Sequence, residues 1–304
     1  MTASSSSAAS REPAPIPFLP GVAPLAARYD GFVLDLWGVI HDGITPYPGV
    51  VDTLRRLRAD GKHVTLLSNA PRRAAEIVAA MEEKMGIPRN LYDGLISSGE
   101  AAYQALRSRA DPWFARLGHA CYLMGPVRDH GMLGGLDMRR VTDMSEAEFI
   151  LATGVDWDDD RLDIYEPALE IGARRGLPMI CANPDLEVIR GGRRVLCAGT
   201  LAHRYESLGG EVRYFGKPFA PIYALCFAQM GIGDRRRIVA IGDSLRTDIA
   251  GACAAGIDSV LVTGGIHAEE LGIAHGEHPD PAALAAACAK GGFRPTAAIP
   301  AFVW

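Results

Sequence analysis

DGFVLDLWGVIHDG, residues 30–43, is a short apolar run that ends in a carboxylate at Asp35 and continues into a glycine-containing turn. Residues 50–60 carry apolar side chains at helical spacing, and residues 63–68 (HVTLLS) are apolar and β-branched, as in a buried strand. Residues 71–85 again have the pattern of an amphipathic helix. This alternation of strand and helix predicts a parallel sheet with crossover helices.

The alternation recurs near the end of the chain. Helices are predicted at 222–230, 248–255 and 281–290, and strands at 237–243 and 258–263. The fold class we expect is therefore α/β, with a Rossmann-like core built from both ends of the sequence.

The segment between these halves has strands and helices of its own, which predicts a second α/β domain inserted into the first. We expect a disordered Ser/Ala/Pro-rich tail at 1–16, a core at 17–118 and 206–304, and an inserted cap at 119–205.

The composition and charge of the chain argue against several classes of function. The chain has 304 residues, of which 48% are hydrophobic and 22% charged, and its net charge of −5 gives no general attraction to nucleic acid or to an anionic membrane. The sequence has neither an apolar run long enough to span a membrane nor the pattern of a secretion signal. Six cysteines without a CxxC pair argue against a zinc site and favour a cytoplasmic protein with reduced thiols.

Three predicted strands end in polar residues, namely Asp35, Ser68 and Asp243. Ligands bind at the carboxyl ends of parallel strands, so we expect these side chains to converge. A carboxylate at Asp35 can attack an electrophilic phosphorus and form an aspartyl-phosphate. Ser68 and Asn69, at the start of the next helix, suit phosphate oxygens.

Two further elements would complete such a site. Lys217 stands between a glycine and a proline that fix the chain, and its cation would offset the charge of a phosphoryl group. Asp243 and Asp248 flank one loop, and with Asp35 they form an oxygen set that Mg²⁺ prefers. Each of these aspartates could instead have only a structural role, as the cap of a turn or of a helix.

At this point the sequence resembles the haloacid dehalogenase superfamily, in the subclass with a large α/β cap that includes NagD-like and pyridoxal-phosphate or phosphoglycolate phosphatases. The resemblance rests on VLDLWGV (33–39), LLSNAPR (66–72), NPD (183–185), GKP (216–218) and GDSLRTD (242–248). It implies that Asp35 is the nucleophile and a Mg²⁺ ligand. The backbone carbonyl of Trp37, Asp243 and Asp248 would be further ligands. It also implies that Ser68 and Asn69 bind phosphate and that Lys217 stabilises it.

The sequence departs from the superfamily at Trp37, where phosphatases usually have a second aspartate that acts as general acid and base. Either His41, Asp42 or a cap residue supplies the proton, or the substrate has a good leaving group that needs none. A third alternative is a ligand-binding or regulatory protein with weak or no turnover.

The leading hypothesis is a Mg²⁺-dependent hydrolase of a small phosphorylated metabolite that works through an aspartyl-phosphate. Asn183 and Asp185 are the candidate substrate-binding residues of the cap, because NPD lies where the cap of the resembling proteins returns to the core. The resemblance also implies a homodimer. The sequence does not identify the metabolite.

Overall fold

The computed structural model describes residues 15–190 and 193–304. Residues 1–14 of the expected tail therefore lie outside the described residues, whereas Ile16 is buried against the core and does not belong to a disordered segment. All six cysteines are free. None of the helices in the described ranges is both long and apolar enough to cross a membrane.

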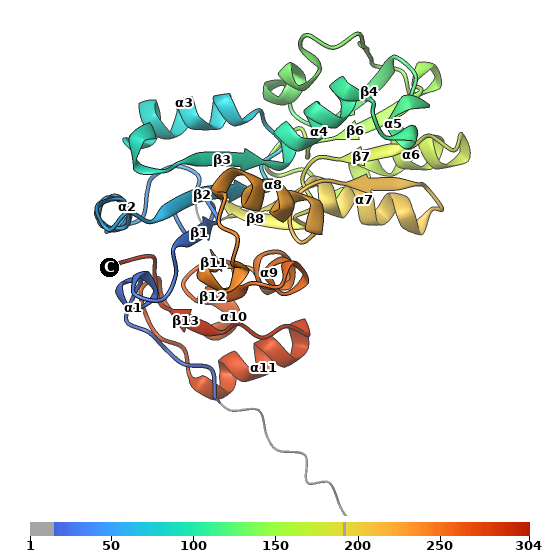
Figure 1. The fold of residues 1–304 in the computed structure, drawn as a ribbon. Helices are drawn as coiled ribbons and strands as arrows, with labels where there is room; N and C mark the ends of the chain where they lie inside the picture. Colours follow the sequence, from blue (N-terminus) through green and yellow to red (C-terminus); the bar gives the residue numbers. More distant parts are fainter. Residues whose placement is uncertain (1–14, 191–192) are drawn as a thin grey trace, which may run out of the picture.

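The larger of two main sheets has six parallel strands (Figure 1). Their spatial order is β13 (Ala297–Ile299), β12 (Asp258–Val262), β11 (Ile238–Gly242), β1 (Gly31–Leu34), β2 (His63–Ser68) and β3 (Gly94–Ser97). In the middle, Gly31 of β1 pairs with Ile238 of β11 on one side and with His63 of β2 on the other. Both ends of the sequence thus meet in one sheet.

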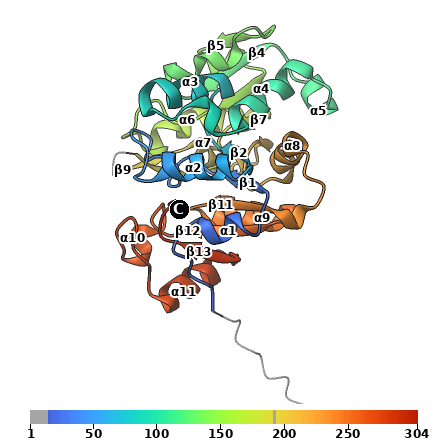
Figure 2. The same ribbon diagram turned by 60° about the vertical axis from the view of Figure 1, so that its left-hand side comes forward.

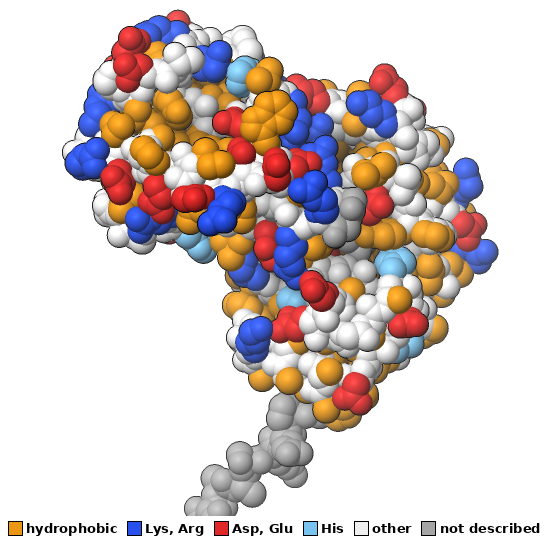
Figure 3. Space-filling view, turned by 180° about the vertical axis from the view of Figure 1, so that it is seen from behind, with side chains coloured by type: hydrophobic (Ala, Val, Ile, Leu, Met, Phe, Trp, Pro, Cys, Tyr) orange, Lys and Arg blue, Asp and Glu red, His pale blue; other side chains and the backbone are white. Residues whose placement is uncertain are grey.

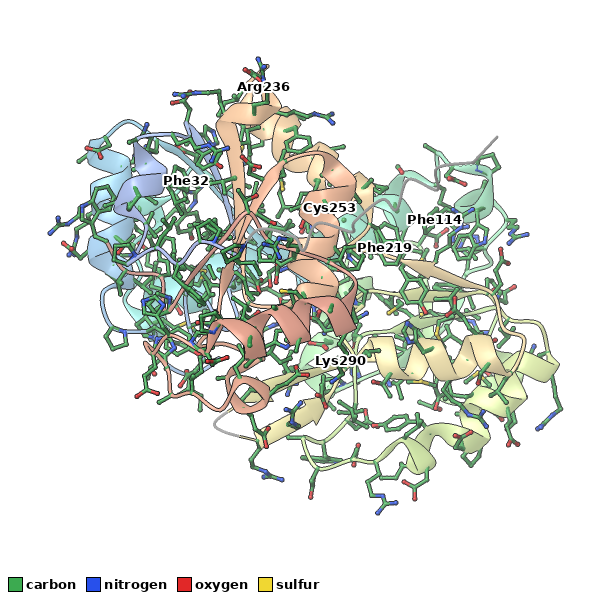
Figure 4. The ribbon with its side chains drawn as sticks, turned by 90° about the horizontal axis from the view of Figure 1, so that it is seen from below. Phe32, Phe114, Phe219, Arg236, Cys253 and Lys290 are labelled. Atoms are coloured by element: carbon green, nitrogen blue, oxygen red, sulfur yellow. The ribbon has the colours of Figure 1, made fainter. Side chains whose placement is uncertain are left out.

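Helices cover both faces of this core sheet, which is why every β1 side chain is buried. Phe32 and Leu34 point to one face, and Val33 points to the other. The first face is covered by α1 (Ala23–Ala26), α2 (Val50–Ala59) and α3 (Ala74–Met85), and the second by α8 (Ala220–Met230), α9 (Ala250–Ala255) and α11 (Pro281–Gly291). Figure 4 labels Phe32 within this core.

The second sheet is also parallel and forms a separate part of the molecule, called the cap from here on (Figure 2). Its order is β10 (Val212–Tyr214), β7 (Met179–Cys181), β6 (Phe149–Ala152), β4 (Ala120–Met124) and β5 (Arg139–Val141). One face packs on α6 (Leu162–Arg174) and α7 (Ala198–Ser207), and the other on α4 (Ser98–Ser108) and α5 (Pro112–Ala115). A hairpin of β8 (Glu187–Arg190) and β9 (Arg193–Leu196) is attached. The expected α/β class with an inserted α/β cap is confirmed.

The cap sheet and its helices extend beyond the expected limits of 119–205 at both ends. Tyr103, Leu106 and Phe114 of α4 and α5 belong to the apolar cluster of the cap, and β10 is an edge strand of its sheet. The sequence pattern gives little information about the boundary of the cap at either end. An amphipathic helix does not say which sheet it will cover, and β10 has only three residues, of which none is fully buried.

The chain returns from the cap to the core through residues 215–219, between β10 and α8. Here the rings of Tyr214 and Phe219 stack with centroids 5.2 Å apart (Phe219 is labelled in Figure 4). The Ser98 hydroxyl donates to the Phe215 carbonyl at 2.5 Å, which ties the outgoing and returning segments together. Lys217 lies within this crossing, so its position depends on both parts of the molecule.

Candidate active site

The carboxyl ends of three neighbouring core strands carry the polar residues expected there. Asp35 directly follows β1, Ser68 ends β2 and Asp243 directly follows β11, and these strands lie side by side in the order β11, β1, β2. The expected convergence arises because parallel neighbours present their carboxyl ends at one edge.

Asp35, Asp243 and Asp248 form a compact acidic cluster. Each offers a carboxylate oxygen, and these three oxygens lie within 4.8 Å of one another. The Lys217 ammonium lies 2.6 Å from Oδ1 of Asp35 and 2.7 Å from Oδ1 of Asp248. All four residues are buried, with Lys217 only 2% exposed. One cation therefore contacts two of three buried carboxylates.

This crowding of negative charge shifts the pKa values of the carboxyl groups in the cluster. Burial and the neighbouring Asp248 raise the pKa of Asp35 and of Asp243 well above the usual range of a carboxyl group. Burial alone would lower the pKa of Lys217, but Asp248 and Asp35 outweigh it and raise that pKa. The cluster thus has a deficit of positive charge, which a bound cation would relieve.

Backbone amides orient the carboxylates. The Ile266 N–H donates to Asp243 at 2.7 Å, and the Ser244 N–H donates to Asp248 at 3.1 Å. Asp248 lies in a π-helical turn, Leu245–Ile249, that leads into α9. Three oriented oxygen donors suit a hard divalent ion such as Mg²⁺, which binds one or two carboxylates together with water and phosphate oxygens. The Trp37 carbonyl as a fourth ligand stays a prediction.

Asn69 links the core to the cap crossing. Its Oδ1 accepts the Lys217 N–H at 2.7 Å, and its Nδ2 donates to the Lys217 carbonyl at 3.1 Å and to Asp185 at 2.9 Å. Both amide hydrogens are used in these bonds. Ser68 accepts the Ala70 N–H at 3.1 Å and so caps the following turn. Phosphate binding by Ser68 and Asn69 stays a prediction, and Asn69 also positions Lys217.

The cap also places polar residues after the carboxyl end of a parallel strand. Asn183 and Asp185 follow β7, and the Asn183 side chain accepts the Asp185 N–H at 3.0 Å in a local turn. Asp185 then reaches Asn69 across the boundary, as described above. The carboxyl edge of the cap sheet therefore faces the carboxyl edge of the core sheet.

A cleft between these edges contains the site. One hollow of about 130 Å³ is lined by Asp35, Trp37, Ser68 and Asn69 from the core and by Asn183 and Asp185 from the cap. A second hollow of about 700 Å³ shares Asp35, Trp37 and Asp185 and adds Asp243. Asp35 and Trp37 thus lie where the two hollows meet.

Seen from behind in Figure 3, basic and acidic side chains are interspersed over the visible face.

Comparison with known proteins agrees with this geometry. Residues 32–138 match the haloacid dehalogenase-like hydrolase family, and residues 214–288 match a group described as HAD-hydrolase-like. A solved hydrolase of the haloacid dehalogenase-like family from Brucella suis 1330 is 33% identical, covers 94% of this chain and 100% of its own, and superposes with a TM-score of 0.79. The chain belongs to the haloacid dehalogenase-like hydrolase family.

Curated members of this family include two similar enzymes. D-glycerol 3-phosphate phosphatase of Mycobacterium tuberculosis is 29% identical over 80% of this chain, but the match spans only 65% of that enzyme's length. The 4-nitrophenylphosphatase of Schizosaccharomyces pombe is 26% identical over 80% of this chain and 86% of its own. These relatives place the chain in the large-cap group of the family, as its motifs indicate.

His41 and Asp42, the two core residues expected to supply a proton in place of a second aspartate, are both engaged in the turn that follows β1. His41 is buried, its Nδ1 accepts the Gly43 N–H at 3.0 Å, and burial lowers its pKa to about 4. Burial would raise the pKa of Asp42, but bonds from the Thr45 and Ile44 amides outweigh it and lower that pKa. His41 is thus neutral and braces the turn, whereas Asp42 is an ionised turn cap.

The lining of the smaller hollow includes four polar or charged residues that were not singled out from the sequence. They are Arg72, which follows the SNAP segment, and Arg128, Asp129 and Thr153 of the cap. The signal was present, because Gly125-Pro126 marks the end of β4 and Thr153 follows β6. Applying the strand-end rule to the cap as well as to the core would have found this edge.

Gly265→Ala is expected to weaken divalent-cation binding about 10- to 100-fold, the usual effect of disturbing a group that positions a metal ligand. A Cβ at Gly265 would lie 2.3 Å from the Cβ and the Oδ2 of Asp243, so this carboxylate must move. Calorimetric titration with Mg²⁺ measures the change. Gly233→Ala is the matched control, because a Cβ there meets nothing within 4 Å. Equal affinities of the two variants would contradict the assignment of Asp243.

Proposed function

We propose that this chain is a Mg²⁺-dependent phosphatase of a small phosphorylated metabolite that transfers the phosphoryl group to Asp35. The observation that carries the proposal is the contact of Asp35 with Lys217 at 2.6 Å inside a cluster of three carboxylates, at the floor of a cleft. The names of the two similar enzymes, a D-glycerol 3-phosphate phosphatase and a 4-nitrophenylphosphatase, agree with it.

In this proposal the two oxygens of Asp35 have different tasks. Oδ1 receives both the Leu36 N–H, at 2.7 Å, and the Lys217 ammonium. Oδ2 is then the oxygen that attacks phosphorus, while the ester oxygen leaves on the opposite side. Lys217 favours the ionised form of Asp35 and offsets the charge that develops on the phosphoryl oxygens. A water molecule later displaces the phosphate from Asp35.

Asp35, Asp243 and Asp248 would hold the Mg²⁺ ion. When bound, it supplies the positive charge that the cluster lacks and neutralises phosphoryl oxygens. The residues fit this ion, because all three donors are carboxylates and burial makes their mutual repulsion costly.

Removal of Mg²⁺ by EDTA is expected to reduce phosphate release to the background rate. Excess Mg²⁺ is expected to stabilise the folded chain, by about 2.7 kcal/mol at a hundred times the dissociation constant. Phosphate release from acetyl phosphate, p-nitrophenyl phosphate, sugar phosphates and glycerol 3-phosphate measures the first effect, and thermal unfolding the second. NaCl at equal ionic strength is the control. Turnover that survives EDTA would contradict the metal requirement.

A second candidate function is a ligand-binding or regulatory protein on the same scaffold, and Trp37 favours it because an indole cannot act as acid or base. It predicts saturable binding of a phosphorylated ligand without phosphate release from any substrate tested. A substrate with a good leaving group is the intermediate case. The homodimer implied by the resemblance stays a prediction, which sedimentation tests.

A further inference from the structure

A phosphatase that acts on alkyl phosphates needs a proton for the departing oxygen. Trp37 stands two residues after Asp35 and lines the cleft, but the indole N–H is too weak an acid for this task. His41 and Asp42 hold the adjoining turn and do not line either hollow of the cleft. The proton must therefore come from another group that borders the same space.

Asp129 is such a group on the cap side. It lies in the short helical segment Val127–Leu133, which follows β4, and it lines the smaller hollow together with Asp35 and Trp37. The residue is only 3% exposed, yet its Oδ1 has no hydrogen-bond partner among the described residues. A buried carboxyl oxygen without a hydrogen-bond partner lowers the stability of the fold, so its presence here calls for a functional explanation.

A hydroxyl beside this carboxyl is in the same condition. Thr153 follows β6, the strand next to β4, and is 2% exposed. Its Oγ1 makes no hydrogen bond of normal geometry in the described part of the chain, although Thr153 lies close enough to Asp129 to favour the charged form of that carboxyl, and it also lines the hollow. Two neighbouring buried polar groups that line the same hollow as Asp35 are what a site for a polar ligand group requires.

We propose that Asp129 is the general acid and general base of this site and takes the role that Trp37 cannot fill. The inference rests on the proposed phosphatase function and adds to it that the substrate class includes alkyl phosphates. Thr153 would accept or donate a hydrogen bond at the leaving-group oxygen and so position it next to Asp129.

The ionisation of Asp129 suits this role. Burial raises its pKa to about 6, although Arg128, Thr153 and Arg72 favour the charged form, and Glu76 adds a smaller upward effect. A carboxyl group with a pKa near the working pH can both donate and accept a proton during one cycle.

The two steps balance in atoms and protons. In the first, an Asp35 oxygen bonds to phosphorus, the phosphorus–ester oxygen bond breaks, and the leaving oxygen takes the proton of Asp129 to become an alcohol. In the second, the Asp129 carboxylate takes a proton from water while the water oxygen bonds to phosphorus. The bond between phosphorus and Asp35 then breaks, which releases phosphate and restores the Asp129 carboxylic acid.

Asp185 is the strongest competing carboxyl in the cleft. Burial raises its pKa as well, and it lines both hollows. However, the side chain of Asn69 donates to it at 2.9 Å, and Asn69 in turn holds Lys217. Asp185 is thus already used to join the cap to the core, whereas the Oδ1 of Asp129 makes no hydrogen bond of normal geometry and its neighbour Thr153 belongs to the cap.

The test compares substrates that differ in their need for an acid. We expect Asp129→Asn to lower kcat for glycerol 3-phosphate by ~10²–10⁴-fold and for p-nitrophenyl phosphate by less than about 10-fold, because nitrophenolate leaves without a proton. Adding Trp37→Asp in the Asp129→Asn background is expected to restore much of the alkyl phosphate turnover. Asp156→Asn is the matched control, since this cap carboxyl borders a different hollow, beside Trp157.

Each other outcome overturns the inference. Equal losses on both substrates would make Asp129 a binding residue, and no loss on glycerol 3-phosphate would remove it from the reaction. A selective loss in Asp185→Asn but not in Asp129→Asn would assign the proton to Asp185. Wild-type turnover of aryl phosphates alone would show that the site contains no acid. Failure of the phosphatase proposal itself looks different, because the wild-type chain would then release phosphate from neither substrate.

Discussion

Asp35→Asn is expected to lower phosphate release by on the order of 10⁴-fold or more, because an amide oxygen is a poor nucleophile and no other group in the cluster replaces it. The fold should survive the change. Lys217 keeps its partner Asp248 at 2.7 Å, and one of three mutually repelling carboxylates becomes neutral. Phosphate release and circular dichroism through a urea titration measure the two effects.

The controls for this variant use the same strand. Asp30→Asn makes the same chemical change just before β1, at the opposite end of the strand, where Asp30 pairs with Arg237 at 2.7 Å. It is expected to leave turnover unchanged. Asp35→Ala guards against slow conversion of the new asparagine to aspartate. If folded Asp35→Asn and Asp35→Ala both turned over substrate at the wild-type rate, Asp35 would not be the nucleophile.

Lys217→Met should have the largest effect on stability. Lys217 is 2% exposed and its ammonium touches two carboxylates, so its removal leaves Asp35 and Asp248 buried without their cation. Breaking a buried ion pair from one side typically costs about 3–5 kcal/mol. We expect a loss of that size in the free energy of unfolding without Mg²⁺. Turnover of the folded fraction should fall by ~10²–10³-fold.

Lys290→Met separates this effect from the general loss of a lysine. Lys290, labelled in Figure 4, pairs with Glu270 at 2.7 Å but is 79% exposed. Exposed pairs of this kind contribute at most about 1 kcal/mol. Urea unfolding of both variants gives the comparison. Equal stabilities of Lys217→Met and Lys290→Met would mean that the buried cluster does not depend on its lysine.

Much of the core could be predicted from local pattern. Asp35, Ser68 and Asp243 were found because each follows an apolar, partly β-branched run, and because parallel strands bring such ends together. Lys217 depended on its Gly and Pro neighbours and on the resemblance. Its double contact with Asp35 and Asp248 could not be foreseen, since it depends on how the cap crossing packs against β2 through Asn69.

The cap was harder to predict for physical reasons. The affiliation of α4 depends on which sheet its apolar face meets, and periodicity shows the face but not the partner. Asp129 lies in a short helical turn without a repeating pattern, so nothing local indicates that its carboxyl is buried. His41 illustrates the opposite error, because a polar residue close in sequence to a nucleophile can serve only the turn that holds it.

The pairing of Gly31 with Ile238 has a consequence for synthesis on the ribosome. Strands β1 to β3 are synthesised first, and the edge of β1 stays unpaired until β11 has been translated, after every strand of the cap has been synthesised. The cap sheet carries its own helices on both faces and has all its strands by then. The nascent chain therefore carries Asp35 long before Asp243 and Asp248 are synthesised, so the buried acidic cluster can assemble only late in synthesis.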